Sequence, residues 1–198
     1  MDLVFDIETD DLKATKIHCL VAQDADTGTL YKYPPDKLQE GYALLEKADR
    51  LIGHNIIGFD IPMVEKFGNV NLSHKPVVDT LVMSRLFNPV REGGHSLEKW
   101  GFRLGFNKID FNDYLNYSNE MMNYCVRDVQ LNTVLFRYLK NEGKGFNKEC
   151  VSLEQAVAKV IKEQEVNGFK FDSKHAELLL AELRFLMQEA EDKVHQVC

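Results

Sequence analysis

The sequence is poor in cysteine and contains no long apolar run. Its four cysteines are scattered over 198 residues, and no two have the spacing of a metal-binding or disulfide motif. No apolar stretch approaches the ~18 residues that a membrane helix requires, and the acidic N-terminus lacks the features of a signal peptide. We therefore expect reduced thiols and a soluble, cytoplasmic protein without a membrane partner.

Basic residues are also scarce. The chain carries 24 lysines and arginines against 31 aspartates and glutamates, which gives a net charge of −7. Proteins that hold nucleic acid by broad electrostatic attraction need clustered Lys and Arg, so the charge balance argues against that class. If the substrate is a nucleic acid, only a few phosphates can be held, and cations must assist.

The pattern along the chain predicts an α/β fold, with strands first and helices later. A meander of three strands comes first, and helices and short buried strands then alternate, which favours a mixed sheet flanked by helices. The expected strands are 2–8, 17–23, 29–33, 50–54 and 76–80, and the expected helices are 37–47, 60–67, 80–87, 97–104, 119–140 and 173–197. Ser96 and Ser118 are placed to cap two of these helices.

The segment "DIETDD", residues 6–11, puts four carboxylates in six positions directly after the apolar run of the first strand. Side chains alternate across a strand, so Asp6 and Glu8 leave the same face, about 7 Å apart at Cα. They can converge on one cation. The alternative is an edge strand with solvated acids, and this segment alone does not decide between the two.

Two further acids, Asp60 and Asp128, could also be cation ligands or could have purely structural roles. Asp60 ends the segment "HNIIGFD" where a helix is expected to begin, so it could simply cap that helix. Tyr124 and Asp128 lie one turn apart on the helix 119–140, among apolar positions that should face inward. This buried pair could merely bond to each other.

Taken together, D-x-E on a first strand, Asp after a strand end, and Y-x-x-x-D on a late helix resemble the DEDD superfamily of 3′–5′ exonucleases, which have a ribonuclease-H-like fold. Tyr124 marks the tyrosine subclass, because the histidine subclass needs His at position 123, where this chain has Asn123. The resemblance is nearest to the proofreading domain of family-A DNA polymerases of short-tailed bacteriophages. It is carried by the blocks "DIETDDL", "HNIIGFDIPMV", "VVDTLVMSRL", "HSLEKWGFRLG" and "MMNYCVRDV".

The resemblance implies two domains and a set of ligands. Residues 1–150 would form the exonuclease domain, and 151–198 would be a helical extension similar to the start of a polymerase module. Two divalent cations, Mg²⁺ or Mn²⁺, suit such oxygen ligands. The resemblance implies these roles: Asp6 would bridge the two ions, Glu8 and Asp128 would complete one site, Asp60 would hold the other through water, and Tyr124 with Glu8 would orient the attacking water.

The resemblance also implies substrate contacts. Thr9 and Leu12 would touch the 3′-terminal nucleotide, and Asn55 and Phe59 occupy substrate-facing positions of the second motif. Leu12 and Phe59 could equally be core residues. A modest phosphate-binding edge could be formed by Arg85, Arg91, Lys99, Arg103 and Lys108, although a solvated helix face explains these residues as well.

The implied function is metal-dependent removal of nucleoside 5′-monophosphates from single-stranded or frayed DNA 3′ ends, which is proofreading during phage DNA replication. Two alternatives stay open: a ribonuclease D-like enzyme that trims RNA 3′ ends, and a non-catalytic scaffold for a polymerase. The expected partners are a DNA 3′ end and a DNA polymerase module, in an infected bacterial cell. Because the helix 173–197 has apolar residues on too many faces for a lone surface helix, we also expect it to dock on a missing partner or on a second copy.

Overall fold

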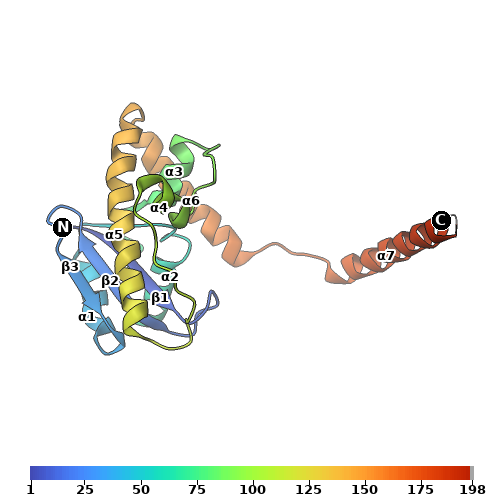
Figure 1. The fold of residues 1–198 in the computed structure, drawn as a ribbon, viewed down its shortest axis with the longest axis horizontal. Coiled ribbons are helices and arrows are strands. Elements are labelled where there is room, and N and C mark those ends of the chain that lie inside the picture. The colour runs from blue at the N-terminus through green and yellow to red at the C-terminus, as the bar shows by residue number, and fades with distance from the viewer. Residues whose placement is uncertain (197–198) are drawn as a thin grey trace. The chain divides into compact units, whose positions relative to one another are not determined.

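The computed structural model describes residues 1–196 and contains a five-stranded mixed sheet (Figure 1). The strands lie in the order β3-β2-β1-β4-β5. Strands β1, β2 and β3 pair antiparallel, whereas β1, β4 and β5 pair parallel. The strands are β1 (Asp2–Thr9), β2 (Ile17–Asp24), β3 (Leu30–Tyr33), β4 (Arg50–Gly53) and β5 (Val77–Asp79). The predicted meander and the predicted mixed sheet are both confirmed.

Apart from the helix Lys148–Asn167, for which no bounds were predicted, the helices begin and end close to the predicted positions. Those that pack on the sheet are α1 (Leu38–Lys47), α2 (Asp60–Gly68), α3 (Thr80–Phe87), α4 (Leu97–Leu104) and α5 (Asn119–Glu142). They are followed by α6 (Lys148–Asn167) and α7 (Ser173–His195), and short 3₁₀ turns lie at Pro35–Lys37 and Gly143–Gly145. The helix expected over 173–197 ends at His195, with Gln196 as its C-cap, and position 197 lies outside the described residues.

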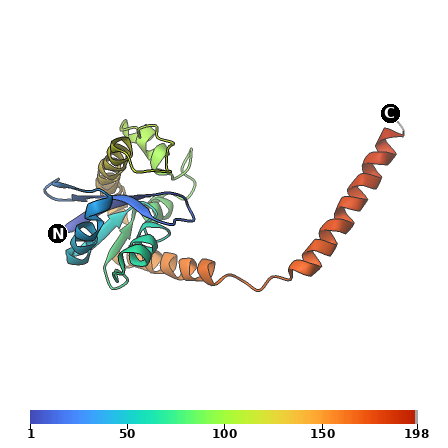
Figure 2. The ribbon, with the colours of Figure 1, turned by 90° about the horizontal axis from the view of Figure 1, so that it is seen from below.

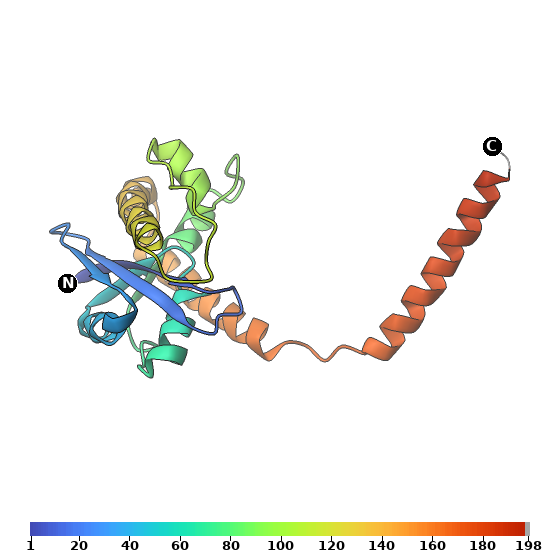
Figure 3. The ribbon, with the colours of Figure 1, turned by 60° about the horizontal axis from the view of Figure 1, so that its bottom comes forward.

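Two apolar layers fix the helices on opposite faces of the sheet (Figures 2 and 3). Because side chains alternate along β1, Leu3 and Phe5 face the layer formed with α1 and α2. Val4 faces the other layer, which contains Trp100 of α4 and the buried side of α5. Any side chain of β1 in register with Val4 therefore points toward α5.

Helix α5 is the longest element and crosses the strands that carry the predicted carboxylates. Ser118 caps it, and its hydroxyl accepts a hydrogen bond from the N–H of Met121 at 3.1 Å. Ser96 caps α4 in the same way through the N–H of Lys99. Both predicted caps are thus confirmed, and the first of them sets where Tyr124 and Asp128 fall along β1.

The described chain forms two compact units, which divide between Glu163 and Gln164. The first unit holds the sheet and its helices, and the second consists of the end of α6, a short connection and α7. The functional division at residue 150 expected from the sequence is a separate matter and stays a prediction. Within residues 1–196, no helix has both the length and the apolar character that crossing a bilayer demands.

Candidate active site

Strand β1 supplies two of the predicted carboxylates. Asp6 and Glu8 follow Val4 at intervals of two, so both side chains point toward α5. Glu8 is 7% exposed although it is an acid on a strand. The solvated edge strand that the sequence left open is therefore not what forms, because β1 is the central strand of the sheet.

Asp60 reaches the same strand from the start of α2. Its Oδ1 accepts a hydrogen bond from the backbone N–H of Ile7 at 3.2 Å, and its carboxylate also bonds to its own backbone N–H at the start of α2. Asp60 is 4% exposed and lies beside the residue that separates Asp6 from Glu8. Capping alone therefore does not account for this side chain, because it also bonds to β1.

Helix α5 brings the remaining two predicted residues. Tyr124 and Asp128 lie one turn apart, and a hydrogen bond from Tyr124 lowers the pKa of Asp128. Asp128 is nonetheless buried, and burial is the larger influence and raises its pKa. The five predicted catalytic side chains thus meet at one place, from β1, α2 and α5.

The carboxylates crowd one another in a poorly hydrated space. Burial is the main cause of the raised pKa of Asp6, and repulsion from Asp60, Glu8 and Asp128 adds to it. Burial likewise raises the pKa of Glu8 to about 9 and that of Asp60 to about 7. Like charges held this close favour either protonation or a bound cation.

The donor atoms fit a divalent cation. Asp6, Glu8 and Cys125 each offer a ligand atom, and these three atoms lie within 4.8 Å of one another. Oδ1 of Asp128 is buried and has no hydrogen-bond partner among residues 1–196, so an acceptor is left for a cation. Carboxylate oxygens are the ligands that Mg²⁺ and Mn²⁺ prefer.

The crowding predicts how stability should change with pH. When metal is chelated, Glu8 has a pKa of about 9 in the folded protein against 4.5 ordinarily, and Asp60 about 7 against 3.8. The folded protein therefore binds more protons than the unfolded chain, and this stability is lost as pH rises through the folded values. We expect the melting temperature in chelator to fall by at least about 3 °C between pH 7 and pH 9. Calorimetry at the two pH values measures this.

Two comparisons complete that measurement. Glu8→Gln should flatten the pH dependence, because it removes the carboxyl whose pKa of about 9 falls in this pH range. Saturating Mg²⁺ should flatten it as well, because a cation favours the deprotonated carboxylates. Burial lowers the pKa of His54 to about 4, so this residue is already neutral at pH 7 and does not contribute. A chelated protein that melts at a higher temperature at pH 9 than at pH 7 would contradict the expectation.

Sequence reasoning named Lys108 only as one of five possible phosphate-binding residues, whereas the structure places it beside the carboxylates. It lies in the irregular segment between α4 and α5, and its Nζ is 2.5 Å from Oδ2 of Asp128. The same ammonium lies 4.7 Å from the centre of the Tyr124 ring. Burial is the largest single influence on the pKa of Lys108 and lowers it, but the attraction and hydrogen bond of Asp128, together with the charges of Asp6 and Glu8, raise it overall.

The other basic residues grouped with Lys108 in the sequence have different surroundings. Arg91 pairs with Glu142 at 2.8 Å and lies over the Trp100 ring. Arg103 also lies over this ring and donates to the carbonyl of Gly94 at 2.7 Å. These two arginines are engaged with the connection between α3 and α4, and the phosphate-binding edge of the five basic residues stays a prediction.

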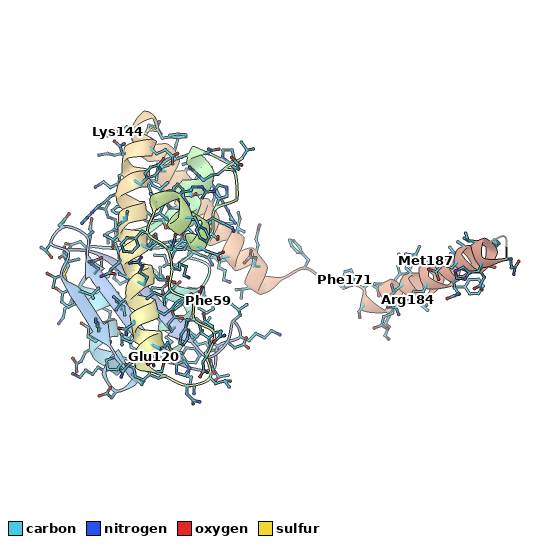
Figure 4. The ribbon with its side chains drawn as sticks, in the orientation of Figure 1. Phe59, Glu120, Lys144, Phe171, Arg184 and Met187 are labelled. Atoms are coloured by element: carbon cyan, nitrogen blue, oxygen red, sulfur yellow. The ribbon has the colours of Figure 1, made fainter. Side chains whose placement is uncertain are left out.

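The predicted substrate contacts lie around the carboxylates, and their roles stay predictions. Leu12 is 85% exposed, so its alternative as a core residue is wrong. Thr9 is buried, and its hydroxyl donates to the carbonyl of Asp11. Phe59, labelled in Figure 4, is half-buried and packs against the apolar layer of α1 and α2. Asn55 is exposed, with a left-handed φ of 66°.

A buried aspartate holds the loop that carries Asn55. The Asp79 carboxylate accepts from the N–H groups of Asn55 at 2.9 Å, Ile57 at 3.1 Å and Leu81 at 2.9 Å. Gln155 of α6 pairs with the Asp79 backbone through both its amide nitrogen and its amide oxygen. Asp79 therefore links β5, α3 and α6 to the loop that leads into Asp60.

Replacing Asp79 with alanine should destabilise the protein by about 2 kcal/mol, because three backbone N–H groups lose their acceptor. One of these groups belongs to Asn55, whose φ is left-handed, and another belongs to Ile57, which is buried. Chemical denaturation followed by circular dichroism measures the loss. Asp36→Ala is the matched control, since Asp36 is exposed and should change stability by less than about 0.5 kcal/mol. Equal stabilities of the two variants would contradict this role of Asp79.

Known proteins resemble this chain in sequence and in fold. No family model matches the chain. The DNA-directed DNA polymerases of Enterobacteria phage T3 and Escherichia phage T7 are each 29% identical to it, over 91% of this chain and 35% of theirs. The chain therefore spans about a third of the length of the curated relatives it matches.

Solved structures with low sequence identity share the fold. NrnC of Brucella melitensis superposes with a TM-score of 0.63 at 19% identity, covering 86% of this chain and 88% of that one. Ribonuclease D of Trypanosoma brucei, in complex with RNA U12, gives a TM-score of 0.58 at 14% identity, covering 80% and 61%. The chain has the mixed-sheet fold of these nucleases, and it is homologous to phage DNA polymerases, as its motifs predict.

Proposed function

We propose that this chain is the 3′–5′ exonuclease part of a phage-type DNA polymerase and removes nucleotides from unpaired DNA 3′ ends. The observation that carries the proposal is the meeting of Asp6, Glu8, Asp60 and Asp128 beside Tyr124, in a chain homologous to phage polymerases. A scaffold has no need of four mutually repelling carboxylates at one buried place, since each costs folding free energy there.

Asp6 is the proposed shared ligand of two cations, with Glu8 and Asp128 on one and Asp60 on the other through water. When bound, Mg²⁺ or Mn²⁺ would activate water and stabilise charge on the attacking and leaving oxygens. The carboxylates themselves contribute by holding the cations at fixed positions in a poorly hydrated site.

Tyr124 is proposed to orient the attacking water rather than take its proton. Burial is the main cause that raises the pKa of Tyr124 above its ordinary value of 10.0, and the Asp128 charge adds to it. The phenol therefore keeps its proton at neutral pH and serves as a hydrogen-bond donor. The ring is held by stacking on Phe111, with centroids 5.4 Å apart.

Unpaired ends are the proposed substrate because a buried site can take only a strand that has left its duplex. A mispaired terminus frays at lower cost than a paired one, which favours its removal. Leu12 is exposed beside the site and is proposed to pack on the terminal base. The charge of −7 fits a substrate held through cations at a few phosphates rather than over a long basic surface.

The test is incubation of a 5′-labelled single strand with Mg²⁺, with and without chelator. We expect a ladder of products shortened from the 3′ end, which chelator abolishes. An all-RNA strand of the same sequence provides the second arm, and faster trimming of RNA would replace this function with a ribonuclease D-like one. If neither strand is shortened in Mg²⁺ or Mn²⁺, the scaffold alternative holds.

The polymerising activity is proposed to reside in sequence that this chain does not contain, within the cytoplasm of an infected host. Helix α7, taken by itself, exposes many apolar side chains, including Phe185 at 64% and Met187 at 62% (Figure 4). We propose that the polymerase module covers this helix, with a second copy of the chain as the alternative.

Light scattering after size-exclusion chromatography distinguishes the two. The chain alone should self-associate if a second copy covers α7, and Leu179→Glu with Leu183→Glu should then return it to a monomer. Glu177→Gln is the control on the same helix. A wild-type chain that stays monomeric and keeps α7 folded would contradict both forms of docking.

A further inference from the structure

Cys125 places a thiol inside the cluster of carboxylates. It is fully buried on α5, between Tyr124 and Asp128, and its Sγ lies 3.5 Å from the Asp6 carbonyl oxygen. The same sulfur is 3.7 Å from Oδ2 of Asp6. The motif that identifies the exonuclease specifies the tyrosine and the aspartate of this helix, and leaves the residue between them open. The thiol is thus a feature of this chain.

A second thiol lies on the same face of the sheet. Cys19 pairs with Glu8 across β1 and β2, is fully buried, and hydrogen-bonds to Cys125. Neither cysteine forms a disulfide. The cluster therefore presents sulfur and oxygen together, whereas a site that serves only Mg²⁺ needs oxygen alone.

The distances suit a small tetrahedral cation. A zinc-class ion binds thiolate sulfur at about 2.3 Å and carboxylate oxygen at about 2.0 Å, so the two ligand atoms should be about 3.5 Å apart. The observed separation of Cys125 Sγ and Asp6 Oδ2 is 3.7 Å. The third ligand atom, on Glu8, lies within 4.8 Å of both, so small side-chain adjustments close the triangle.

A further acceptor at the cluster is already unpartnered. Oδ1 of Asp128 is buried, and it has no hydrogen-bond partner among residues 1–196. Asp128 is close enough to Asp6 and Glu8 that its charge acts on both. Asp128 therefore adds negative charge near the three ligand atoms, and water can take the fourth position of a tetrahedral ion.

We propose that Asp6, Glu8 and Cys125 form a site selective for thiophilic divalent cations of the zinc and cadmium class, and that loading it arrests the exonuclease. The Cys125 S–H bond breaks, an S–metal bond forms, and the proton leaves to solvent, with no change in oxidation state. The claim that the site binds such a cation, the binding half of the proposal, rests on geometry. The claim that binding arrests the exonuclease, the inhibitory half, rests on the proposed function. A tightly held thiolate-bound ion would occupy the ligands needed for Mg²⁺.

Cadmium is the probe for the binding half, because thiolate-to-cadmium charge transfer absorbs in the ultraviolet and needs no activity. Wild-type protein should show this band at one equivalent of Cd²⁺, with release of a proton. Cys125→Ser should lose the band and bind Cd²⁺ at least tenfold more weakly. The control replaces Cys150 and Cys198 with serine, keeps Cys19 and Cys125, and should keep the band. Cys125→Ala gives a second non-ligating variant, and circular dichroism checks that each variant is folded.

The outcomes separate the two halves. A band that persists in folded Cys125→Ser, or an unchanged cadmium affinity, overturns the site. If the band is lost as expected, the inhibitory half is tested by adding Cd²⁺ to the Mg²⁺ reaction on labelled single strand. Half-inhibition should then require at least tenfold more Cd²⁺ in Cys125→Ser, relative to that variant's own uninhibited rate, and equal sensitivity overturns the inhibitory half. Absence of any Mg²⁺ activity in the wild type overturns the proposed function and leaves the cadmium site decided by absorption.

Discussion

Asp6→Asn is expected to slow nucleotide release by roughly a thousandfold or more, which corresponds to about 4 kcal/mol of lost transition-state stabilisation. Asparagine keeps the size of the side chain and removes the charge that the two proposed cations would share. Asp6 also lies nearest the centre of the cluster, since the charges of Asp60, Glu8 and Asp128 all act on it. The largest single loss is therefore expected here.

Single-turnover release from a 5′-labelled strand in Mg²⁺ measures the effect. Asp26→Asn is the matched control, because Asp26 is an exposed acid in the turn between β2 and β3. Unfolding cannot account for the loss, because removing one of several crowded charges should leave the melting temperature in chelator equal or higher. An Asp6→Asn variant that retains a tenth of the wild-type rate would remove Asp6 from the reaction.

Much of this site could be predicted from the sequence because its features are local. Alternation along one strand puts Asp6 and Glu8 on a common face, and a single helical turn separates Tyr124 from Asp128. Ser118 fixes where α5 begins. Such short-range rules give each residue a direction, and the resemblance to phage polymerases supplied the pairing of distant segments.

The features that were missed depend on long-range packing. Lys108 lies in a segment without regular structure, so no periodicity indicates that its ammonium turns back to Asp128. Asp60 has the sequence position of a helix cap, yet its carboxylate bonds to β1, 53 residues away. Cys125 has the sequence position of a small apolar residue on the inward face of α5, and its polar neighbours Asp6 and Glu8 come from a strand more than a hundred residues away.

The second large effect is expected from Lys108→Met, which removes the ammonium and keeps the length of the side chain. Asp128 would then be buried without a counter-ion, so the protein should lose about 3 kcal/mol of stability in chelator. Denaturant unfolding measures this loss. Lys99→Met is the control, because Lys99 is exposed on α4 and lies only over the Phe102 ring, 5.5 Å from its centre.

Magnesium should reverse part of that loss, because Lys108 and a divalent cation satisfy the same carboxylate and therefore compete. Removing the competitor should tighten Mg²⁺ binding roughly tenfold, which is worth about 1.4 kcal/mol and recovers about half of the lost stability at saturation. Calorimetric titration gives the change in Mg²⁺ affinity, and unfolding in Mg²⁺ gives the recovered stability. The two free energies must agree, because binding to the folded protein is what stabilises it. Weaker Mg²⁺ binding by Lys108→Met would mean that the ammonium assists the cation instead of standing in for it. Lys108 is 2.5 Å from Oδ2 of Asp128 while Oδ1 has no partner, so one oxygen is held by the lysine and the other is left for the metal.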